Sequence, residues 1–418
     1  MPNDDSSSTN LDSSANRHSS RAVVVGAGPA GALLAYLLAR RGVAVTLLEP
    51  QTDFSREFRG EVLMPSGIAA LHEAGLRQKF NALPHQALDT VELFRGERRL
   101  VSIPLANLDL QPLVVPQAPM LEMIVAEAAK FPGFVLERGT TVRDLISEND
   151  RVVGVRADTA SGPRDFRADF VIACDGRASV IRKRAGFPPD RIMQGFDVMW
   201  GHIPGYFLDG RIGRAYFGSG HLLLIYPSPE GHMQFGWIID KGTFGDIRKL
   251  GAEGWIARVA PHVSADLRKF LESNRDALAH PFLLDVICER LREWTAPGLL
   301  LIGDAAHPMS PVGGQGINVA LRDAVVAGNH LGRALAMRSD AATLDFAARN
   351  IQAERWPEIV TIQDMQQIGP RFLVSNSLLS RIIVSTPMIA FAKLFLRNFF
   401  VKQFDPFLHG VTRVQMEE

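Results

Sequence analysis

An aspartate and a glycine-rich turn stand close together late in the chain, where Gly-Asp-Ala-Ala-His-Pro-Met-Ser-Pro-Val-Gly-Gly-Gln-Gly-Ile-Asn occupies residues 303–318. Asp304 can accept hydrogen bonds from ligand hydroxyl groups, and backbone amides near Gly314–Gly316 can face negative charge where a helix begins. The apolar run 299–302 predicts a buried strand before the block, and helical spacing of the apolar residues after it predicts a helix from about Gln315. The block therefore predicts a site for a polar ligand between a strand end and a helix start.

A second glycine-rich turn lies near the N-terminus, between an apolar run at 22–25 and a leucine-rich helical stretch. In Gly-Ala-Gly-Pro-Ala-Gly, Gly26 permits the tight turn, Gly28 lets a pyrophosphate approach the backbone, and Gly31 allows close helix–strand packing. The next apolar run ends in Glu49, which is placed to bind ribose hydroxyls rather than a 2′-phosphate. The unit predicts a dinucleotide site for FAD or NAD, formed by Gly26, Gly28, Pro29, Ala30, Gly31 and Glu49.

A third motif, Asp-Gly-Arg-Ala-Ser-Val-Ile-Arg at residues 175–182, follows another apolar run. Asp175 can bind the backbone amides of the turn, Ser179 can cap the segment that follows, and Arg182 can anchor the loop. Much of the work of this motif is expected to be structural, with a direct cofactor contact by Asp175 as the alternative.

Taken in chain order between residues 22 and 324, the three motifs resemble those of the single-component FAD-dependent monooxygenases of the aromatic hydroxylase class, the p-hydroxybenzoate hydroxylase-like enzymes. The resemblance implies FAD held without a covalent bond, NADH or NADPH as a transient reductant, and O2 as co-substrate. A flavin C4a-hydroperoxide would then hydroxylate or epoxidise an apolar or aromatic small molecule, such as a secondary metabolite. An FAD-dependent reductase of a prenyl-like substrate and a catalytically silent FAD-binding partner stay open as alternatives.

The resemblance also implies roles for single residues. Pro311 is expected to lie against the flavin ring, the backbone at Gly314 to stabilise the reduced flavin, and Arg59, followed by glycine, to reach FAD and receive the nicotinamide. Gln117 stands where the family commonly has arginine, so it can hydrogen-bond to FAD but brings no charge. The complete set expected to bind the cofactor is Gly26, Gly28, Pro29, Ala30, Gly31, Glu49, Arg59, Gln117, Asp175, Asp304, Gly314, Gly316, Ile317 and Asn318.

The expected fold is α/β, with a Rossmann-like FAD-binding domain of the GR2 type, an inserted and mainly antiparallel β-sheet substrate domain, and a helical C-terminal region. The expected ranges are 1–20 for a disordered tail, 21–85, 112–185 and 281–365 for the FAD-binding domain, 86–111 and 186–280 for the substrate domain, and 366–418 for the helical region.

The sequence between residues 195 and 240 is strand-rich, which fits the substrate domain that the resemblance implies, with a sheet that roofs the flavin and lines a substrate pocket. No residue declares itself as a base that would activate a phenol, and His202 and Tyr226 are the nearest candidates. The polar and aromatic side chains that could line the pocket are Trp200, His202, Tyr216, Tyr226, Gln234 and Trp237.

The composition narrows the class of protein. Lys+Arg and Asp+Glu both total 45 in 418 residues, so no basic field favours nucleic acid. The 11 histidines form no His-x-x-x-His pair, and Cys174 and Cys288 lie in apolar runs, so the sequence predicts no metal site and two reduced thiols in a cytoplasmic protein. The apolar, cationic stretch 378–401 could pack within the protein, lie on a membrane surface or form a homodimer face.

Overall fold

The buried valines and leucines of the two predicted nucleotide motifs lie side by side in one six-stranded sheet. The structure, a computed structural model, describes residues 22–55, 61–208, 210–218, 221–279, 281–373 and 405–417. The sheet is parallel except for its edge pair β20–β21. Its order is β20-β21-β12-β1-β2-β8, with β1 (Ala22–Val25), β2 (Val45–Glu49), β8 (Phe134–Arg138), β12 (Phe170–Ala173), β20 (Thr295–Ala296) and β21 (Leu299–Leu301).

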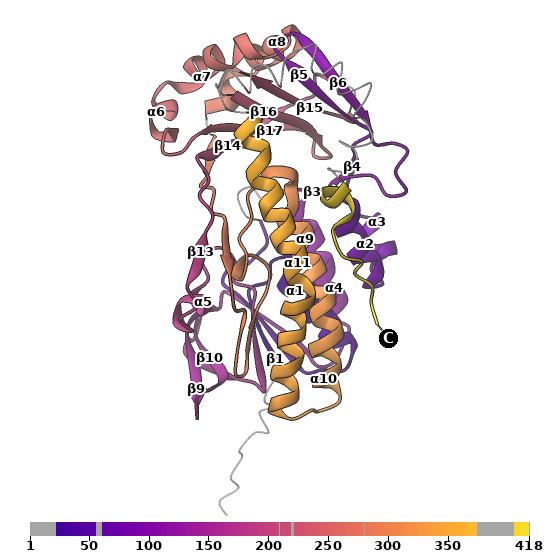
Figure 1. Cartoon of the computed structure of the whole chain (residues 1–418), viewed down its shortest axis with the longest axis vertical. Coiled ribbons are helices and arrows are strands. Elements are labelled where there is room, and N and C mark those ends of the chain that lie inside the picture. Colours follow the sequence, from indigo (N-terminus) through magenta and orange to yellow (C-terminus); the bar gives the residue numbers. More distant parts are fainter. Residues whose placement is uncertain are drawn as a thin grey trace, which may run out of the picture.

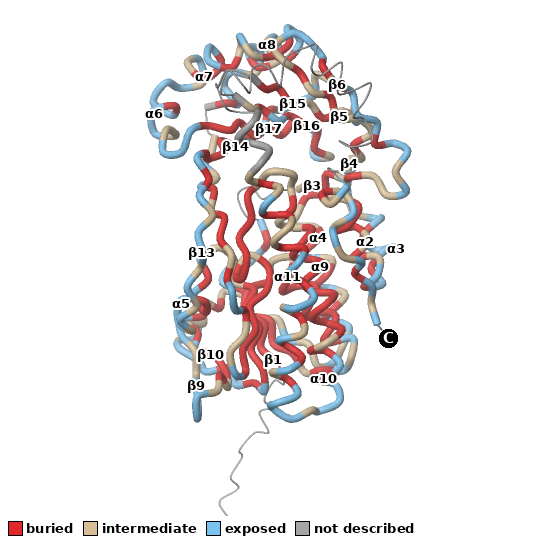
Figure 2. The backbone as a smooth tube through the Cα atoms, in the orientation of Figure 1, coloured by how far each residue is buried: buried red, intermediate tan, exposed pale blue. Residues whose placement is uncertain are grey.

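Helices pack beside this sheet, and every residue of β1, β12 and β21 is buried, as expected for central parallel strands (Figure 2). Helix α1 contacts both α4 and α9, and α11 contacts α9. The helices of this half are α1 (Pro29–Arg40), α2 (Pro65–Glu73), α3 (Arg77–Asn81), α4 (Gln117–Ala128), α5 (Val180–Arg184), α9 (Gln315–Ala327), α10 (Arg333–Ala336) and α11 (Ala341–Leu373), with the short turns η3 (Gly303–Ala305), η4 (Val312–Gly314) and η5 (Gly328–Gly332).

Three small sheets complete this half of the molecule. A three-stranded antiparallel sheet contacts β12 through β10, and a two-stranded pair links the two halves (Figure 1). The strands are β9 (Thr141–Glu148), β10 (Arg151–Thr159) and β11 (Gly162–Arg167); β13 (Pro189–Arg191) and β19 (Glu289–Leu291); and β3 (Val62–Leu63), β4 (Gln86–Ala87) and β7 (Leu113–Val114).

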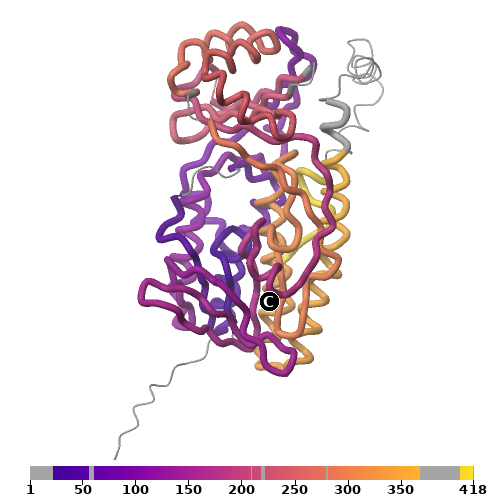
Figure 3. The backbone as a smooth tube through the Cα atoms, turned by 90° about the vertical axis from the view of Figure 1, so that its left-hand side faces the viewer, coloured from indigo at the N-terminus to yellow at the C-terminus, as the bar shows by residue number. Residues whose placement is uncertain are grey.

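A seven-stranded sheet forms the other end of the molecule, above the six-stranded sheet in Figures 1 and 3. It is antiparallel apart from the parallel pair β5–β15. Its order is β18-β14-β17-β16-β15-β5-β6, with β5 (Thr90–Arg95), β6 (Arg98–Pro104), β14 (Phe196–Pro204), β15 (Ile212–Gly218), β16 (His221–Ser228), β17 (His232–Asp240) and β18 (Phe282–Leu284). Its outer face carries α6 (Phe244–Lys249), α7 (Gly251–Val259), α8 (Ala265–Ser273), η1 (Ala260–His262) and η2 (Arg275–Ala279).

The fold is α/β with an inserted, mainly antiparallel sheet, as the sequence predicted. Strand β18 pairs with β14 in the inserted sheet, on the far side of the boundary expected at residue 281. Residues 405–409 form a helical turn near α9, and the last described residues reach α2 through a hydrogen bond from the Met416 amide to Glu73. Within the described residues, no helix has the length and apolarity needed to cross a bilayer. The stretch 378–401 and the tail 1–20 lie outside the described residues.

Candidate active site

The N-terminal glycine turn has the backbone geometry that a pyrophosphate site needs. Gly26 has a φ of 95°, and a Cβ on it would lie 2.5 Å from the carbonyl oxygen of Cys174. A Cβ on Gly31 would lie 1.9 Å from the carbonyl oxygen of Gly26, so helix α1 can approach the turn only with glycine there. A Cβ on Gly28 would meet nothing within 4 Å, which leaves open space in front of the start of α1. Gly26 and Gly31 thus allow close packing within the protein, whereas the backbone at Gly28 is open to a ligand.

Glu49 closes this turn from the end of β2. One of its carboxylate oxygens accepts a hydrogen bond from the Ala27 amide at 2.9 Å, and the other accepts from the Gln51 amide at 3.1 Å. The side chain is buried, with an exposed fraction of 1% for the residue. A carboxylate has about four lone-pair positions, so its oxygens can accept from ribose hydroxyls as well as from backbone amides.

Asp304 lies directly beyond β21 and beside the start of α9. One of its carboxylate oxygens is 3.9 Å from the position that a Cβ on Gly316 would take. Nε of Arg177 is 3.9 Å from the other oxygen, and both side chains remain 36% exposed. The structure therefore brings together the acid of the late motif, the helix start, and an arginine of the Asp-Gly motif, with the carboxylate still open to a ligand.

The loop before α9 has a left-handed backbone at two successive residues, with φ of 76° at Gly313 and 62° at Gly314. Pro311, just before the η4 turn, is half-buried. The amide of the Gln315 side chain donates 2.8 Å hydrogen bonds to the carbonyls of Gly313 and Phe407. Since only glycine takes the left-handed conformation without a steric cost, the loop shape depends on both glycines and on the C-terminal turn that covers them.

Helix α11 holds the same loop from another side. The amide nitrogen of Gln366, a completely buried side chain, donates to the carbonyls of Ser310 and Val312, each at 2.8 Å. No sequence pattern points to Gln366, which lies 52 residues from the glycine loop in sequence, counted from Gly314.

The Asn318 side chain binds protein rather than facing a ligand. Its oxygen accepts from the Met64 amide at 2.8 Å, and its nitrogen donates to the carbonyls of Gly314 at 2.7 Å and Val62 at 3.3 Å. A Cβ on Gly67 would lie 2.1 Å from the Asn318 oxygen, so α2 packs directly on this residue. The cofactor contact expected of Asn318 is therefore left to its backbone, because the side chain ties α9 to β3 and α2.

The Asp-Gly motif folds upon itself. Asp175 accepts from the Ser179 hydroxyl at 2.6 Å and from the amides of Val180 and Ile181 at 2.8 and 3.2 Å. Burial raises the pKa of the Asp175 carboxyl, although these hydrogen bonds oppose the shift. The buried guanidinium of Arg182 bonds to the Arg177 carbonyl at 2.8 Å. Ser179 is the N-cap of α5, with its hydroxyl accepting from the Arg182 amide at 2.9 Å, and Asp175 holds the first two helix amides, in keeping with the structural role expected for most of the motif.

A buried charged cluster behind the late motif escaped the sequence analysis. Asp323 accepts from the Gly303 amide at 3.0 Å, from Nε2 of His307 at 2.8 Å, and from Nε of Arg355 at 2.8 Å. Glu358 completes the cluster by pairing with Arg355 at 2.5 Å. Burial alone would raise the pKa of Asp323, but the charges and hydrogen bonds of His307 and Arg355 hold it below its usual value. The cluster fixes the backbone just before Asp304.

Alternation along the seven-stranded sheet divides the expected pocket residues between its two faces. Trp200, Tyr226 and Val312 belong to one apolar cluster on the face toward the glycine loop. Gln234 pairs in register with Tyr226 and with His202, so these three share that face.

The expectation that Tyr216 and Trp237 line the pocket is wrong. Both belong to the apolar core under α7 and α8. The Tyr216 hydroxyl binds Ser264 at 2.6 Å, and the Trp237 ring packs on Trp255 at 5.9 Å. Side chains of adjacent residues on a strand point to opposite faces of the sheet. Helices α7 and α8 cover the face that carries Tyr216 and Trp237.

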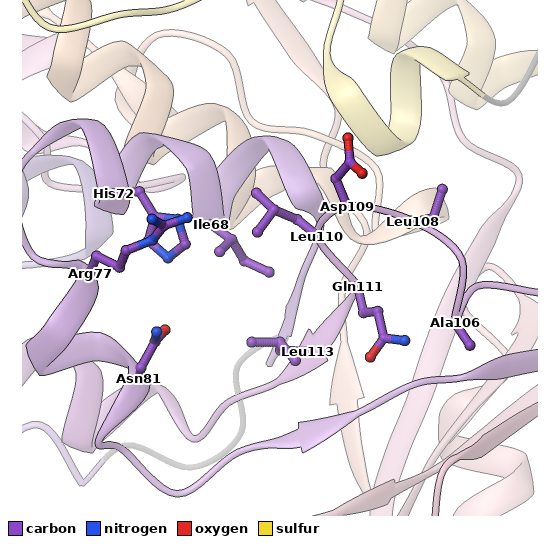
Figure 4. A pocket seen from close by; sticks show the side chains of 10 residues that line it. All are labelled: Ile68, His72, Arg77, Asn81, Ala106, Leu108, Asp109, Leu110, Gln111 and Leu113. Atoms are coloured by element: carbon purple, nitrogen blue, oxygen red, sulfur yellow. The ribbon is translucent and has the colours of Figure 1, made fainter.

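Two other expected site residues are half-buried at helix starts, and a third lies outside the described residues. Gln117 is half-buried at the first turn of α4, and Ile317 is half-buried in the first turn of α9. Arg59 lies in the segment 56–60, outside the described residues. A surface pocket of about 510 Å³ between α2, α3 and the loop 105–113 contains His72 and Arg77 but none of the expected flavin residues (Figure 4).

The residues present fit FAD. An open Gly28 backbone at a helix start suits a pyrophosphate, the Glu49 carboxylate suits a ribose, and the half-exposed Asp304 suits a polyhydroxyl chain. The amides after the left-handed Gly314 begin a second helix, where partial positive charge would face an anionic ring edge.

The sequence family described as FAD binding domain matches residues 19–210 and 284–356, more than half of the chain. The chain belongs to this family and is an FAD-dependent monooxygenase with FAD as its cofactor and NADH or NADPH as its reductant.

Relatives and solved structures agree with this class. The chain is 33% identical over 371 residues to 6-methylpretetramide 4-monooxygenase of Streptomyces rimosus, which covers 85% of each protein. It is 27% identical to rifampicin monooxygenase of Streptomyces venezuelae, over 82% of this chain and 69% of that one. In fold it is similar to p-nitrophenol 4-monooxygenase from Pseudomonas putida DLL-E4, with a TM-score of 0.78 at 20% identity, over 94% of this chain and 99% of that structure.

Proposed function

We propose that this monooxygenase inserts one oxygen atom into an aromatic small molecule, a secondary metabolite, bound beneath the seven-stranded sheet. The observation that carries the proposal is the apolar cluster that joins Trp200 and Tyr226 of the sheet to Val312 of the glycine loop. Large aromatic side chains facing the predicted flavin loop favour a flat, apolar ligand. The name of the relative that acts on 6-methylpretetramide supports the same substrate class.

FAD, when bound, supplies electron transfer from NADH or NADPH and the reaction with O2. The chain's part is binding and orientation. We propose that the backbone of 26–31 holds the pyrophosphate, Glu49 a ribose, and Asp304 the ribityl hydroxyls. The amides from Gly314 to Asn318 would stabilise negative charge at the ring edge, and Pro311 would lie against the ring. Gln117 would add a hydrogen bond to FAD, and Arg59 would reach FAD and help to receive the nicotinamide.

We also propose that residues 86–111 and 186–280, extended by β18, act as the substrate domain, and that the rest of 21–365 binds FAD. In this division the apolar cluster lies at the boundary between the two parts, where water can be excluded from the reacting atoms. We further propose a cytoplasmic location, and a contact of segment 378–401 with a membrane surface or with a second copy of the chain. Vesicle flotation tests the membrane contact, and sedimentation analysis tests the dimer contact.

The test is an anaerobic reduction followed by aeration. NADPH or NADH should bleach the flavin of the purified holoenzyme, and air should restore it. Addition of 6-methylpretetramide or a related polycyclic aromatic should accelerate reduced-nucleotide oxidation, with one ¹⁸O atom from ¹⁸O2 in the product. A flavin that is reduced but never transfers oxygen to any aromatic would contradict the proposal. The reductase alternative is not favoured, because relatives of higher identity are monooxygenases.

A further inference from the structure

One carboxylate reaches from the flavin-binding half to the underside of the seven-stranded sheet. Glu61 lies just before β3, and its carbonyl accepts from the Val115 amide at 2.8 Å. Its carboxylate accepts a hydrogen bond from the side-chain amide of Gln234 on β17. Three residues further on, the Met64 amide is held by Asn318 at the start of α9. Glu61 is therefore fixed between the sheet and the predicted flavin loop.

The surroundings of this carboxylate are those of a ligand site rather than of a surface ion pair. Gln234 is 1% exposed, and its side-chain oxygen is buried without a hydrogen-bond partner among the described residues. Tyr226 lies beside Gln234 in register, and Val62 and Trp200 belong to the same apolar cluster. A buried amide that donates to Glu61 and has an unused acceptor leaves one hydrogen-bonding position for a ligand hydroxyl.

The charge around Glu61 favours its protonation near neutral pH. Burial first, and then repulsion by Glu230 of the β16–β17 turn, raise the pKa of Glu61 to about 7, against the opposing hydrogen bond from Gln234. Among the residues that the structure describes, the other titratable group facing it is Tyr226, whose pKa is raised by burial and then by Glu61. Within the described residues, no cation pairs with Glu61. A carboxyl poised in this range can take and release a proton at working pH.

We propose that Glu61 is the base that deprotonates a hydroxyl group on the aromatic substrate, and that Gln234 orients it. The inference rests on the proposed function and narrows its substrate to a phenol or an enol. The proton passes from the substrate oxygen to the Glu61 carboxylate, leaving a phenolate and a neutral carboxylic acid. No electrons move in this step, and the proton leaves later to water. The phenolate ring is more electron-rich than the ring of the neutral phenol, so it accepts an electrophilic oxygen atom more readily.

Binding of a matched pair of probes tests the proposal on the holoenzyme. The probes are 2-naphthol and its methyl ether, 2-methoxynaphthalene, followed by their fluorescence. Wild-type protein should bind 2-naphthol about tenfold more tightly or better, and the preference should grow as pH rises through about 7, because only ionised Glu61 accepts the proton. In Glu61→Gln the preference should shrink and its pH dependence should disappear, because an amide can accept a hydrogen bond but not a proton, and FAD content should stay unchanged.

Two further variants separate charge from packing. Glu230→Gln removes the repulsion, so the pH at which the preference appears should fall. Glu253→Gln, at an 82% exposed side chain on α7, should leave the probe binding unchanged. Equal affinity for the two probes in wild type, no binding of either probe, or an unchanged preference in Glu61→Gln would overturn the role of Glu61. A flavin that NADPH and NADH cannot reduce would refute the proposed function instead, so the two failures are distinguishable.

Once a hydroxylated substrate is known, turnover gives a second readout. Glu61→Gln should lower the rate of substrate oxygenation by about 100-fold or more, the usual range for loss of a general base. Glu253→Gln, at an exposed side chain on α7, should oxygenate the substrate at the wild-type rate. Oxygenation at the wild-type rate in Glu61→Gln would also overturn the role.

Discussion

Asn318→Ala should weaken FAD binding more than it weakens the fold. The side chain makes three hydrogen bonds, to the Met64 amide and to the carbonyls of Gly314 and Val62, at 2.8, 2.7 and 3.3 Å. The first two of these partners are neighbours at the predicted flavin loop, since a Cβ on Gly314 would lie 3.9 Å from the Met64 side chain. Alanine would release the Gly314 carbonyl from the start of α9 and leave the Met64 amide without its acceptor.

The size of the effect follows from these contacts. A hydrogen bond contributes a net of about 1 kcal/mol, so the loss of three costs about 3 kcal/mol. Part of this loss appears as lower stability of the apoprotein, and part as freedom in the loop that FAD must reorder. If about half falls on the bound state, the FAD dissociation constant rises about tenfold, since 1.4 kcal/mol corresponds to a factor of ten.

The assay is flavin-fluorescence titration of the apoprotein, together with its melting temperature. Asn318→Asp should be no better than alanine, because it keeps the acceptor for Met64 but turns an oxygen toward two carbonyls. Asn274→Ala, which removes one 2.9 Å bond to the Phe270 carbonyl in α8, is the control and should leave FAD affinity unchanged. The reasoning fails if Asn318→Ala keeps both the wild-type melting temperature and the wild-type FAD affinity.

Three other predictions concern the N-terminal glycine motif, Asp304 of the late motif, and the buried charged cluster around Asp323. Gly28→Val should contain no flavin and should melt at the temperature of wild-type apoprotein, because its side chain enters open space that the pyrophosphate needs. Gly31→Ala should fail to fold stably, since its Cβ would meet backbone at 1.9 Å. Yellow Gly28→Val protein would contradict this. Asp304→Ala should yield apoprotein by absorbance, and full flavin retention would remove its proposed role. Asp323→Asn should cost about 3 kcal/mol or more at pH 7, because it breaks a buried ion pair with Arg355. The folded pKa of Asp323 is depressed, so its contribution is present above the ordinary value of 3.8 and the difference between wild type and variant should shrink as pH falls below that value in denaturant titrations.

The sequence by itself determined the motifs whose demands are local. Gly26 must take a positive φ, Gly31 must lack a Cβ, and the apolar run 22–25 must be a buried strand, all within ten residues of chain. The left-handed Gly314 and the helix that follows are local in the same sense. The Gly31 requirement can be read in residue order because the Gly26 carbonyl that a Cβ would meet belongs to the same motif. The positive φ of Gly26 is likewise a property of the turn itself, although the Cys174 carbonyl that packs against it comes from a distant strand end.

Tertiary structure decided which polar groups remain for a ligand. Asn318 belongs to the glycine motif, yet its side chain is occupied because β3 and α2 arrive from 254 residues away. Asp323, His307 and Arg355 gather around the Gly303 amide only when α9 and α11 pack together. Each contact depends on segments whose meeting no local pattern records.

The same holds for the two faces of the inserted sheet. Alternation separates Tyr226 from Tyr216 and Gln234 from Trp237, but the sequence does not say which set faces the flavin. Helices α7 and α8 cover one face, and their packing assigns Trp237 to a core and Gln234 to the site. Glu61 gains its raised pKa in the same way, because burial and charge at that point come from strands more than a hundred residues away. The local motifs thus determined the class of cofactor. The packing of segments distant in sequence determined which side chains can act on the substrate.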